Sequence, residues 1–92
     1  MNNKYLPIGT VVILNGGSKK AMITGYQVHP VDNEKKKYDY RGCPFPEGVM
    51  RSKGIVLFNA NQIKEICHMG WECDESIDFL DKLEYLVDTM KK

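Results

Sequence analysis

Apolar and β-branched residues form two short runs near the N-terminus, and turn residues separate them. The first run covers residues 10–14 (TVVIL) and the second covers residues 21–28 (AMITGYQV). Val, Ile and Thr suit a pleated, half-buried surface, and the intervening residues 15–18 (NGGS) suit a tight turn. The pattern therefore predicts a β-hairpin. Gly25, inside the second run, predicts a bulge or a sharp bend.

The middle of the chain mixes polar, alternating and proline-rich segments. Residues 29–37 are polar, begin with a His-Pro step and predict a loop. In residues 38–40 (YDY) the alternation predicts a short strand with both tyrosines on one face and the aspartate on the other. Residues 42–48 (GCPFPEG) hold two prolines and two glycines, so we expect a shaped loop rather than regular structure there.

Three more segments precede the C-terminal region. Residues 55–58 (IVLF) predict a strand, and residues 59–62 predict a single helical turn capped by Asn59. Residues 63–69 suit either a strand or a helix. We predict a strand, because Gly70 follows too soon for a helix of ordinary length.

The C-terminal segment has the clearest periodicity in the chain. The positions that recur three or four residues apart are Ser76, Phe79, Leu80, Leu83, Leu86, Val87 and Met90. Apart from the serine they form one apolar stripe, which predicts an amphipathic helix over about residues 75–90. Asp74 is the expected N-cap. The stripe should pack on the core, although so small a protein could leave part of it uncovered.

Together these elements predict one domain over residues 1–92, strand-rich over residues 6–70. The fold class is α+β, mainly β: a small SH3-like curled antiparallel sheet or barrel of about five strands with one C-terminal amphipathic helix. The composition, 42% hydrophobic and 27% charged, is typical of a globular protein and not of a disordered chain.

The charge pattern argues against a strongly basic, nucleic-acid-binding protein. The net charge is only +1. Residues 19–53 carry eight Lys or Arg against four Asp or Glu, a balance of +4, whereas residues 54–92 carry four against eight, a balance of −4. The near-neutral total therefore hides a dipolar chain, which matters for docking more than for folding.

Sequence features that reveal location point to the cytoplasm. No apolar run approaches the ~20 residues that a membrane span needs, and the N-terminus has no apolar signal-peptide region. The chain has three cysteines, whereas small secreted scaffolds usually carry an even number. We therefore expect reduced thiols in a cytoplasmic protein without a membrane span.

Cysteine and histidine residues raise the question of a metal site or a catalytic centre. Cys67, His68 and Cys73, even with Cys43 and His29, lack the paired spacing of zinc ligands, so we expect buried, unreactive cysteines. A dyad of Cys43 with either histidine stays open as an alternative, because such geometry cannot be read from spacing. Nucleotide-binding motifs are missing from the sequence, and we expect no enzyme activity, no metal and no cofactor.

An RNA-binding SH3-like module is the main alternative to a protein-binding one. Tyr26, Tyr38, Tyr40 and Phe45 could stack on bases, and lysines follow the hairpin turn. The acidic C-terminal half opposes phosphate, which makes this the weaker hypothesis. Trp71 is expected to fill the core, with a role as an interface anchor as the alternative.

Several segments together resemble a known family. The resemblance is carried by residues 6–14, 16–17 and 20–25, by the central signature 38–48 (YDYRGCPFPEG), and by Phe58-Asn59, Gln62-Ile63 and Gly70-Trp71. Over roughly residues 6–83 the chain resembles domain-of-unknown-function family 4176, which comprises small proteins of Gram-positive bacteria. Such proteins are commonly encoded near type VII secretion systems and their LXG-type toxins.

The resemblance implies an accessory, adaptor or chaperone-like role in toxin export, exerted through a protein partner. It supplies no catalytic residue. We expect binding through the signature segment 38–48 or through the predicted helix 75–90. The candidate partner-binding residues are Tyr38, Asp39, Tyr40, Cys43, Phe45, Glu47 and Trp71.

Overall fold

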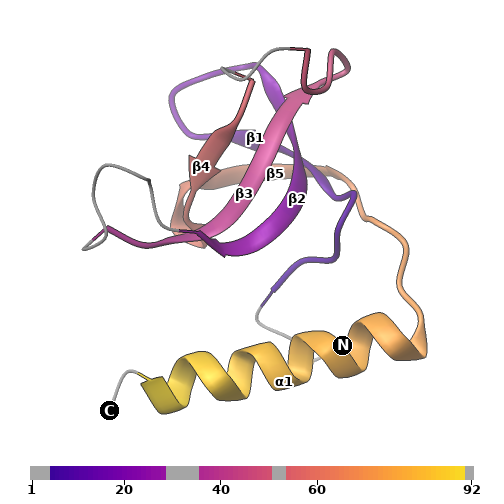
Figure 1. Cartoon of the computed structure of the whole chain (residues 1–92). Helices are drawn as coiled ribbons and strands as arrows, with labels where there is room; N and C mark the ends of the chain where they lie inside the picture. The colour runs from indigo at the N-terminus through magenta and orange to yellow at the C-terminus, as the bar shows by residue number, and fades with distance from the viewer. Residues whose placement is uncertain (1–4, 29–35, 51–53, 91–92) are drawn as a thin grey trace.

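The computed structural model describes residues 5–28, 36–50 and 54–90 (Figure 1). The elements, in chain order, are β1 (Val11–Leu14), β2 (Lys20–Val28), β3 (Tyr38–Phe45), β4 (Val56–Phe58), a 3-10 turn (Ala60–Gln62), β5 (Ile63–His68) and α1 (Asp74–Met90). The predicted hairpin, the three later strands and the C-terminal helix are confirmed. Most of the expected loop over residues 29–37 lies outside the described residues.

The five strands form one antiparallel sheet in the order β4-β3-β2-β1-β5. In the described part of the chain the outer strands β4 and β5 do not pair with each other, so the sheet curls but stays open. The predicted class is confirmed: α+β, mainly β, with an SH3-like curled sheet rather than a closed barrel.

Register shifts bend the sheet in two of its strand pairings. The pairing of β2 with β3 shifts between Ile23 and Gly25, which confirms the bulge predicted at this glycine. The pairing of β1 with β5 shifts between Val11 and Val12 and again between Ile13 and Leu14. Each irregularity increases the local twist of its strand, which lets a short sheet wrap around a core.

The prediction of an irregular loop over residues 42–48 is wrong for its first half. β3 continues through Gly42, Cys43 and Pro44 to Phe45, all in register with β2. Only the residues that follow turn away, and the N–H of Gly48 donates a 2.7 Å hydrogen bond to the carbonyl of Pro44. β4 pairs with β3 only as far as Gly42, so the proline lies where β3 has one open edge, the position at which a strand tolerates proline.

The helical turn predicted at residues 59–62 is present and has Asn59 at its N-cap, as predicted. Asp39 of β3 accepts a 2.9 Å hydrogen bond from the N–H of Ala60, the first residue of the turn. The side chain of Asn59 instead accepts a hydrogen bond from the N–H of Asp39, and its own N–H donates to Gln62. The turn is therefore fastened to β3 by a reciprocal pair of bonds between Asp39 and residues 59–60.

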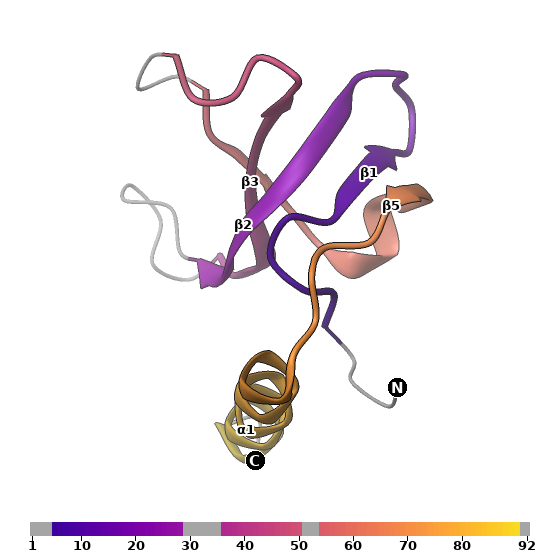
Figure 2. The same ribbon diagram turned by 90° about the vertical axis from the view of Figure 1, so that its right-hand side faces the viewer.

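The hydrophobic core lies between the concave face of the sheet and α1. Its buried members are Tyr5, Val12, Ala21, Ile23, Tyr40, Phe58, Leu80 and Val87. The helix contributes Leu80 and Val87, two turns apart on one face. Figures 1 and 2 show that α1 lies away from the strands and that the N-terminal segment runs through the space between them.

The start of α1 differs by one residue from the prediction. The N–H of Ile77 donates to the carbonyl of Cys73, so Cys73 rather than Asp74 occupies the N-cap position. The hydroxyl of Ser76 accepts a 2.9 Å hydrogen bond from the N–H of Cys73 and satisfies that donor. Ser76 thus acts from inside the first turn, as the third residue of a capping box does.

Within residues 5–28, 36–50 and 54–90, no helix is long and apolar enough to cross a bilayer.

Gly70 joins β5 to the segment that leads into α1, and its missing side chain is a packing requirement. A Cβ there would collide with the carbonyl oxygen of Ile8 and lie 2.9 Å from the N atom of Thr10. We expect Gly70→Ala to lower the free energy of unfolding by about 2 kcal/mol or more, because backbone must move to admit it. Denaturant unfolding measures the change.

The matched control for this substitution is Gly17→Ala in the hairpin turn. Nothing lies within 4 Å of a Cβ built at Gly17. Its free energy of unfolding should change by no more than about 0.5 kcal/mol. Equal stability of the two variants would contradict the close approach at Gly70.

Candidate functional site

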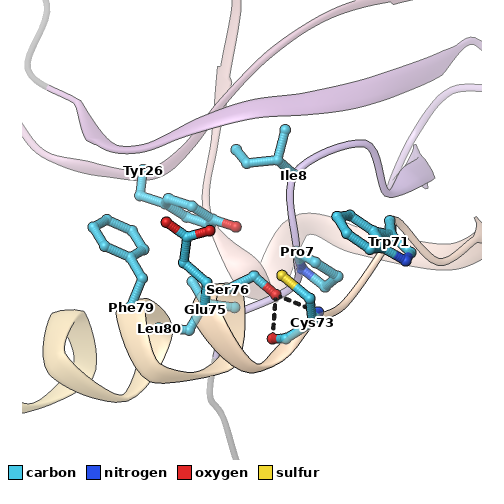
Figure 3. A pocket seen from close by; sticks show the side chains of 9 residues that line it. All are labelled: Pro7, Ile8, Tyr26, Trp71, Cys73, Glu75, Ser76, Phe79 and Leu80. Atoms are coloured by element: carbon cyan, nitrogen blue, oxygen red, sulfur yellow. Dashed lines mark hydrogen bonds between the residues drawn. The ribbon is translucent and has the colours of Figure 1, made fainter.

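An apolar groove runs between the N-terminal segment, the end of β2 and the first two turns of α1 (Figure 3). Its volume is about 360 Å³. The lining residues are Pro7, Ile8, Tyr26, Trp71, Cys73, Glu75, Ser76, Phe79 and Leu80. Concave, mainly apolar surfaces of this kind are where proteins most often bind ligands or partner side chains.

Two tyrosine hydroxyls fix the wall of the groove that Pro7 and Ile8 supply. The hydroxyl of Tyr40 accepts a 3.0 Å hydrogen bond from the N–H of Leu6. The hydroxyl of Tyr26 donates a 2.5 Å hydrogen bond to the carbonyl oxygen of Leu6. Both backbone groups of one residue are therefore satisfied by side chains from the sheet. This clamp gives the segment a single position over the sheet although it belongs to no strand.

The ring of Tyr26 forms the roof of the groove and belongs to a cluster of aromatic side chains. Its ring centre lies 5.7 Å from that of Tyr5, 5.9 Å from that of Tyr40 and 6.2 Å from that of Phe79. Burial, with a smaller contribution from Tyr40, raises the pKa of Tyr26 to about 12. The phenol is therefore neutral at any physiological pH and donates its proton to the Leu6 carbonyl.

α1 provides the opposite wall. Figure 3 shows Glu75 and Phe79 directed from the helix toward the ring of Tyr26. Leu80 lies deeper and is fully buried, whereas Phe79 keeps 54% of its surface exposed. The helix thus presents one apolar side chain to the core and another to the groove in consecutive positions.

Trp71 closes the far end of the groove, and the expectation that it fills the core is wrong. Its side chain is 82% exposed. The backbone next to it lies flush against residues 8–10, where the N–H of Gly70 donates a 3.0 Å hydrogen bond to the hydroxyl of the buried Thr10. This contact fixes the chain at the rim and leaves the indole outside. The alternative, an interface anchor, is consistent with this position.

The other candidate partner-binding residues do not converge on the groove. Tyr40 and Cys43 are buried, and Tyr38 and Asp39 are half-buried. Phe45 and Glu47 lie at and just beyond the end of β3, which Figures 1 and 2 place away from α1. The signature segment is therefore mainly structural: it builds a central strand and fastens the 3-10 turn.

Glu47, in the turn after β3, is held by an ion pair. Lys19 lies 2.5 Å from its carboxylate, and this hydrogen bond lowers the pKa of Glu47 below its usual value. Both side chains are about half exposed, so the pair contributes little to stability. It ties the turn after β3 to the hairpin turn after β1.

A second hollow, of about 510 Å³, lies over β1, β2 and β5 and is lined in part by Phe45, Cys67 and His68. The expected burial of the cysteines is confirmed for Cys43 and wrong for Cys67, which is exposed, while Cys73 is half-buried. Among the described residues no three His, Cys, Asp or Glu side chains lie together as metal ligands would. His29, the other suggested partner of Cys43, lies outside the described residues.

Sequence reasoning did not single out Ile8 or Phe79 as site residues, and it named Tyr26 only as a candidate for stacking on RNA bases. Ile8 and Phe79 were indistinguishable from core residues because their apolar character is the same. The sequence held one signal of a site on α1: its apolar stripe is wider than a sheet this small can cover, so part of the stripe had to stay exposed.

Fold and groove together define the chain as a small, mainly β module whose open, curled sheet carries one helix-walled apolar groove. The chain matches the family described as a domain of unknown function (DUF4176) over residues 5–79 and belongs to that family. The match confirms the resemblance and covers the whole sheet, Trp71 and the start of α1. Searches of curated proteins and of solved structures found no significant match.

The clamp at Leu6 can be tested through Tyr26. Tyr26→Phe removes the hydrogen bond to the Leu6 carbonyl, so we expect the free energy of unfolding at neutral pH to fall by about 1 kcal/mol. The wild-type protein should lose stability as pH rises from 10 through about 12, because the unfolded phenol ionises there and the folded one resists. The variant should lose less over this range. Denaturant unfolding at several pH values measures both effects, and identical pH profiles would contradict the assignment.

The exposure of Trp71 predicts a small effect on folding. Trp71→Ala should change the free energy of unfolding by no more than about 0.5 kcal/mol, since few contacts are lost. Phe58→Ala is the buried counterpart and should cost about 3–5 kcal/mol. Thermal or denaturant unfolding measures the stability of the two variants. Comparable losses of unfolding free energy would show that the indole of Trp71 is packed in the core.

Proposed function

We propose that this protein is a non-enzymatic cytoplasmic protein-interaction module that serves as an accessory, adaptor or chaperone-like factor for type VII secretion of LXG-type toxins. The observation that carries the proposal is the apolar groove with the exposed Trp71 at its rim. A large aromatic side chain with most of its surface in water suits a residue that a partner buries.

The residue types around the groove support protein binding over small-molecule chemistry. Trp71, Phe79 and Ile8 are partly exposed, and each offers a large apolar surface. Aromatic anchors are enriched among the residues that dominate binding energy at protein interfaces. All three line the same groove, with Trp71 and Phe79 at its two ends, so a partner meets several anchors within one surface (Figure 3).

The family supports the choice of partner. Proteins that resemble family 4176 are commonly encoded near type VII secretion systems and LXG-type toxins, and this chain belongs to that family. A small module with a preformed groove suits an adaptor, because it can hold a segment of a toxin or of its targeting partners without a chemical step.

The RNA-binding alternative has less support. Base stacking needs open aromatic faces, yet Tyr40 is buried and the ring of Tyr26 packs among other aromatic rings, including that of Phe79. α1 has six acidic residues against one lysine, and this excess of negative charge repels phosphate.

Co-purification from native cells tests the proposed function. Tagged full-length protein should recover an LXG-type toxin or a secretion component, and Trp71→Ala should reduce that recovery about tenfold, as expected for loss of an interface anchor. Phe45→Ala, an exposed aromatic far from the groove, is the control and should leave recovery unchanged. Recovery of neither class of protein by the wild type would contradict the proposal.

A further inference from the structure

We propose that the groove and the adjoining outer face of α1 bind an amphipathic helix of another protein, one that carries Lys or Arg beside its apolar seam. This inference rests on the proposed function and adds the conformation and the charge of the partner segment. Four observations lead to it: the spacing of exposed residues on α1, the size of the groove, the state of its backbone groups and the charge of its walls.

α1 has two apolar seams rather than one. The inner seam, Leu80, Leu83 and Val87, faces the core. Leu80 and Val87 are buried, and Leu83 is partly buried. The outer seam is Phe79, Leu83 and Leu86, spaced by four and three residues, the repeat that packs one helix along another. Phe79 and Leu86 are 54% and 56% exposed, so the described residues leave about half of each of these two side chains uncovered, while Leu83 between them packs on the core.

The outer seam and the groove form one continuous surface. Phe79 belongs to both, with Leu86 two turns beyond it and Ile8 and Trp71 on the other side. The groove volume of about 360 Å³ is more than twice the ~150 Å³ of a cavity that holds one benzene, so it accepts about two large apolar side chains. Phe79 to Leu86 spans about 10 Å along the axis, enough for two further turns of a partner helix.

The backbone around the groove favours a helix over an extended peptide. An added strand needs open N–H and C=O groups, and the N-terminal wall has few. Both groups of Leu6 are bound by tyrosines, the N–H of Gly9 donates to Ile23, and the N–H of Thr10 donates to Pro7. The hydroxyl of Tyr26 is also occupied and cannot orient a proline-rich peptide. A helix satisfies its own backbone and needs only apolar pockets.

Charge decides against a second copy of this chain and for a basic partner. α1 carries Asp74, Glu75, Asp78, Asp81, Glu84 and Asp88 against Lys82, a balance of −5. The lysine is already paired with Asp78 at 3.0 Å. Two such helices side by side would repel, whereas Lys or Arg flanking a partner seam would meet Glu75 at the groove wall.

The test uses the full-length protein and designed peptides of about 20 residues, long enough to form a helix. Three peptides are compared, all without tryptophan and all with the same leucines in the apolar seam. The first is a helix with Lys beside the seam, and the second is the same helix with Glu in place of Lys. The third contains prolines that prevent it from forming a helix. Trp71 is the only tryptophan of the chain, so its emission reports burial directly. The Lys peptide should shift this emission to shorter wavelength and bind at least about tenfold more tightly than either other peptide.

Two matched variants locate the binding surface on α1. Leu86→Gln removes an outer-seam residue and should weaken binding of the Lys peptide about tenfold. Tyr85→Gln changes a neighbour that is 71% exposed but lies off the seam, and should alter affinity less than about twofold. Equal effects of the two substitutions, tighter binding of the Glu or proline peptide, or no binding by any peptide would overturn the proposal. A concentration-dependent shift without peptide would show that a second copy occupies the face, and would overturn it as well.

The outcome is separable from that of the proposed function. If native co-purification recovers a toxin equally with wild type and Leu86→Gln, the adaptor role stands and the helix proposal fails. If the Lys peptide binds as described while no toxin or secretion component is recovered, the groove inference stands and the secretion role fails.

Discussion

The clamp on Leu6 by the hydroxyls of Tyr26 and Tyr40 is the interaction on which the rest of the structure depends. It fixes a segment outside the sheet, and α1 reaches the core beside that segment. Burial of two phenols is tolerable because each hydroxyl has a backbone partner. A buried hydroxyl without a hydrogen-bond partner would raise the free energy of the folded state and favour release of the N-terminal segment. Neutrality of the phenols, kept by their raised pKa values, preserves the clamp over the physiological range.

The same clamp makes the groove possible. Pro7 and Ile8 form one wall only because Leu6 is held, and α1 forms the other wall because Leu80 is anchored in the core. The space between the walls stays open since neither the sheet nor the helix is wide enough to fill it. A thin core in a small protein therefore leaves apolar surface for a partner, and the acidic helix gives that surface a preferred sign of charge.

Local patterns predicted most of the elements. Alternation and turn chemistry were enough for the hairpin, and Gly25 marked the bulge, because both depend on residues close in sequence. The prolines after Gly42 were misleading: β2 pairs with this stretch and overrides its local preference for a loop. The N-cap of α1 is Cys73 rather than Asp74, because Ser76, within the first turn, accepts a hydrogen bond from the N–H of Cys73. Such caps depend on geometry that spacing alone does not reveal.

By itself the sequence determined the fold class, the helix with its apolar stripe and the dipolar charge, because periodicity and composition act locally. It also determined family membership, which the match over residues 5–79 shows. Only the tertiary structure decided which apolar residues stay outside the core. Gly70 presses against Ile8 and Thr10 and so leaves Trp71 exposed, while the narrow sheet covers Leu80 and Val87 but not Phe79 or Leu86. Apolar residues in a pattern look alike, and only packing distinguishes those that a small core can bury from those left for a partner.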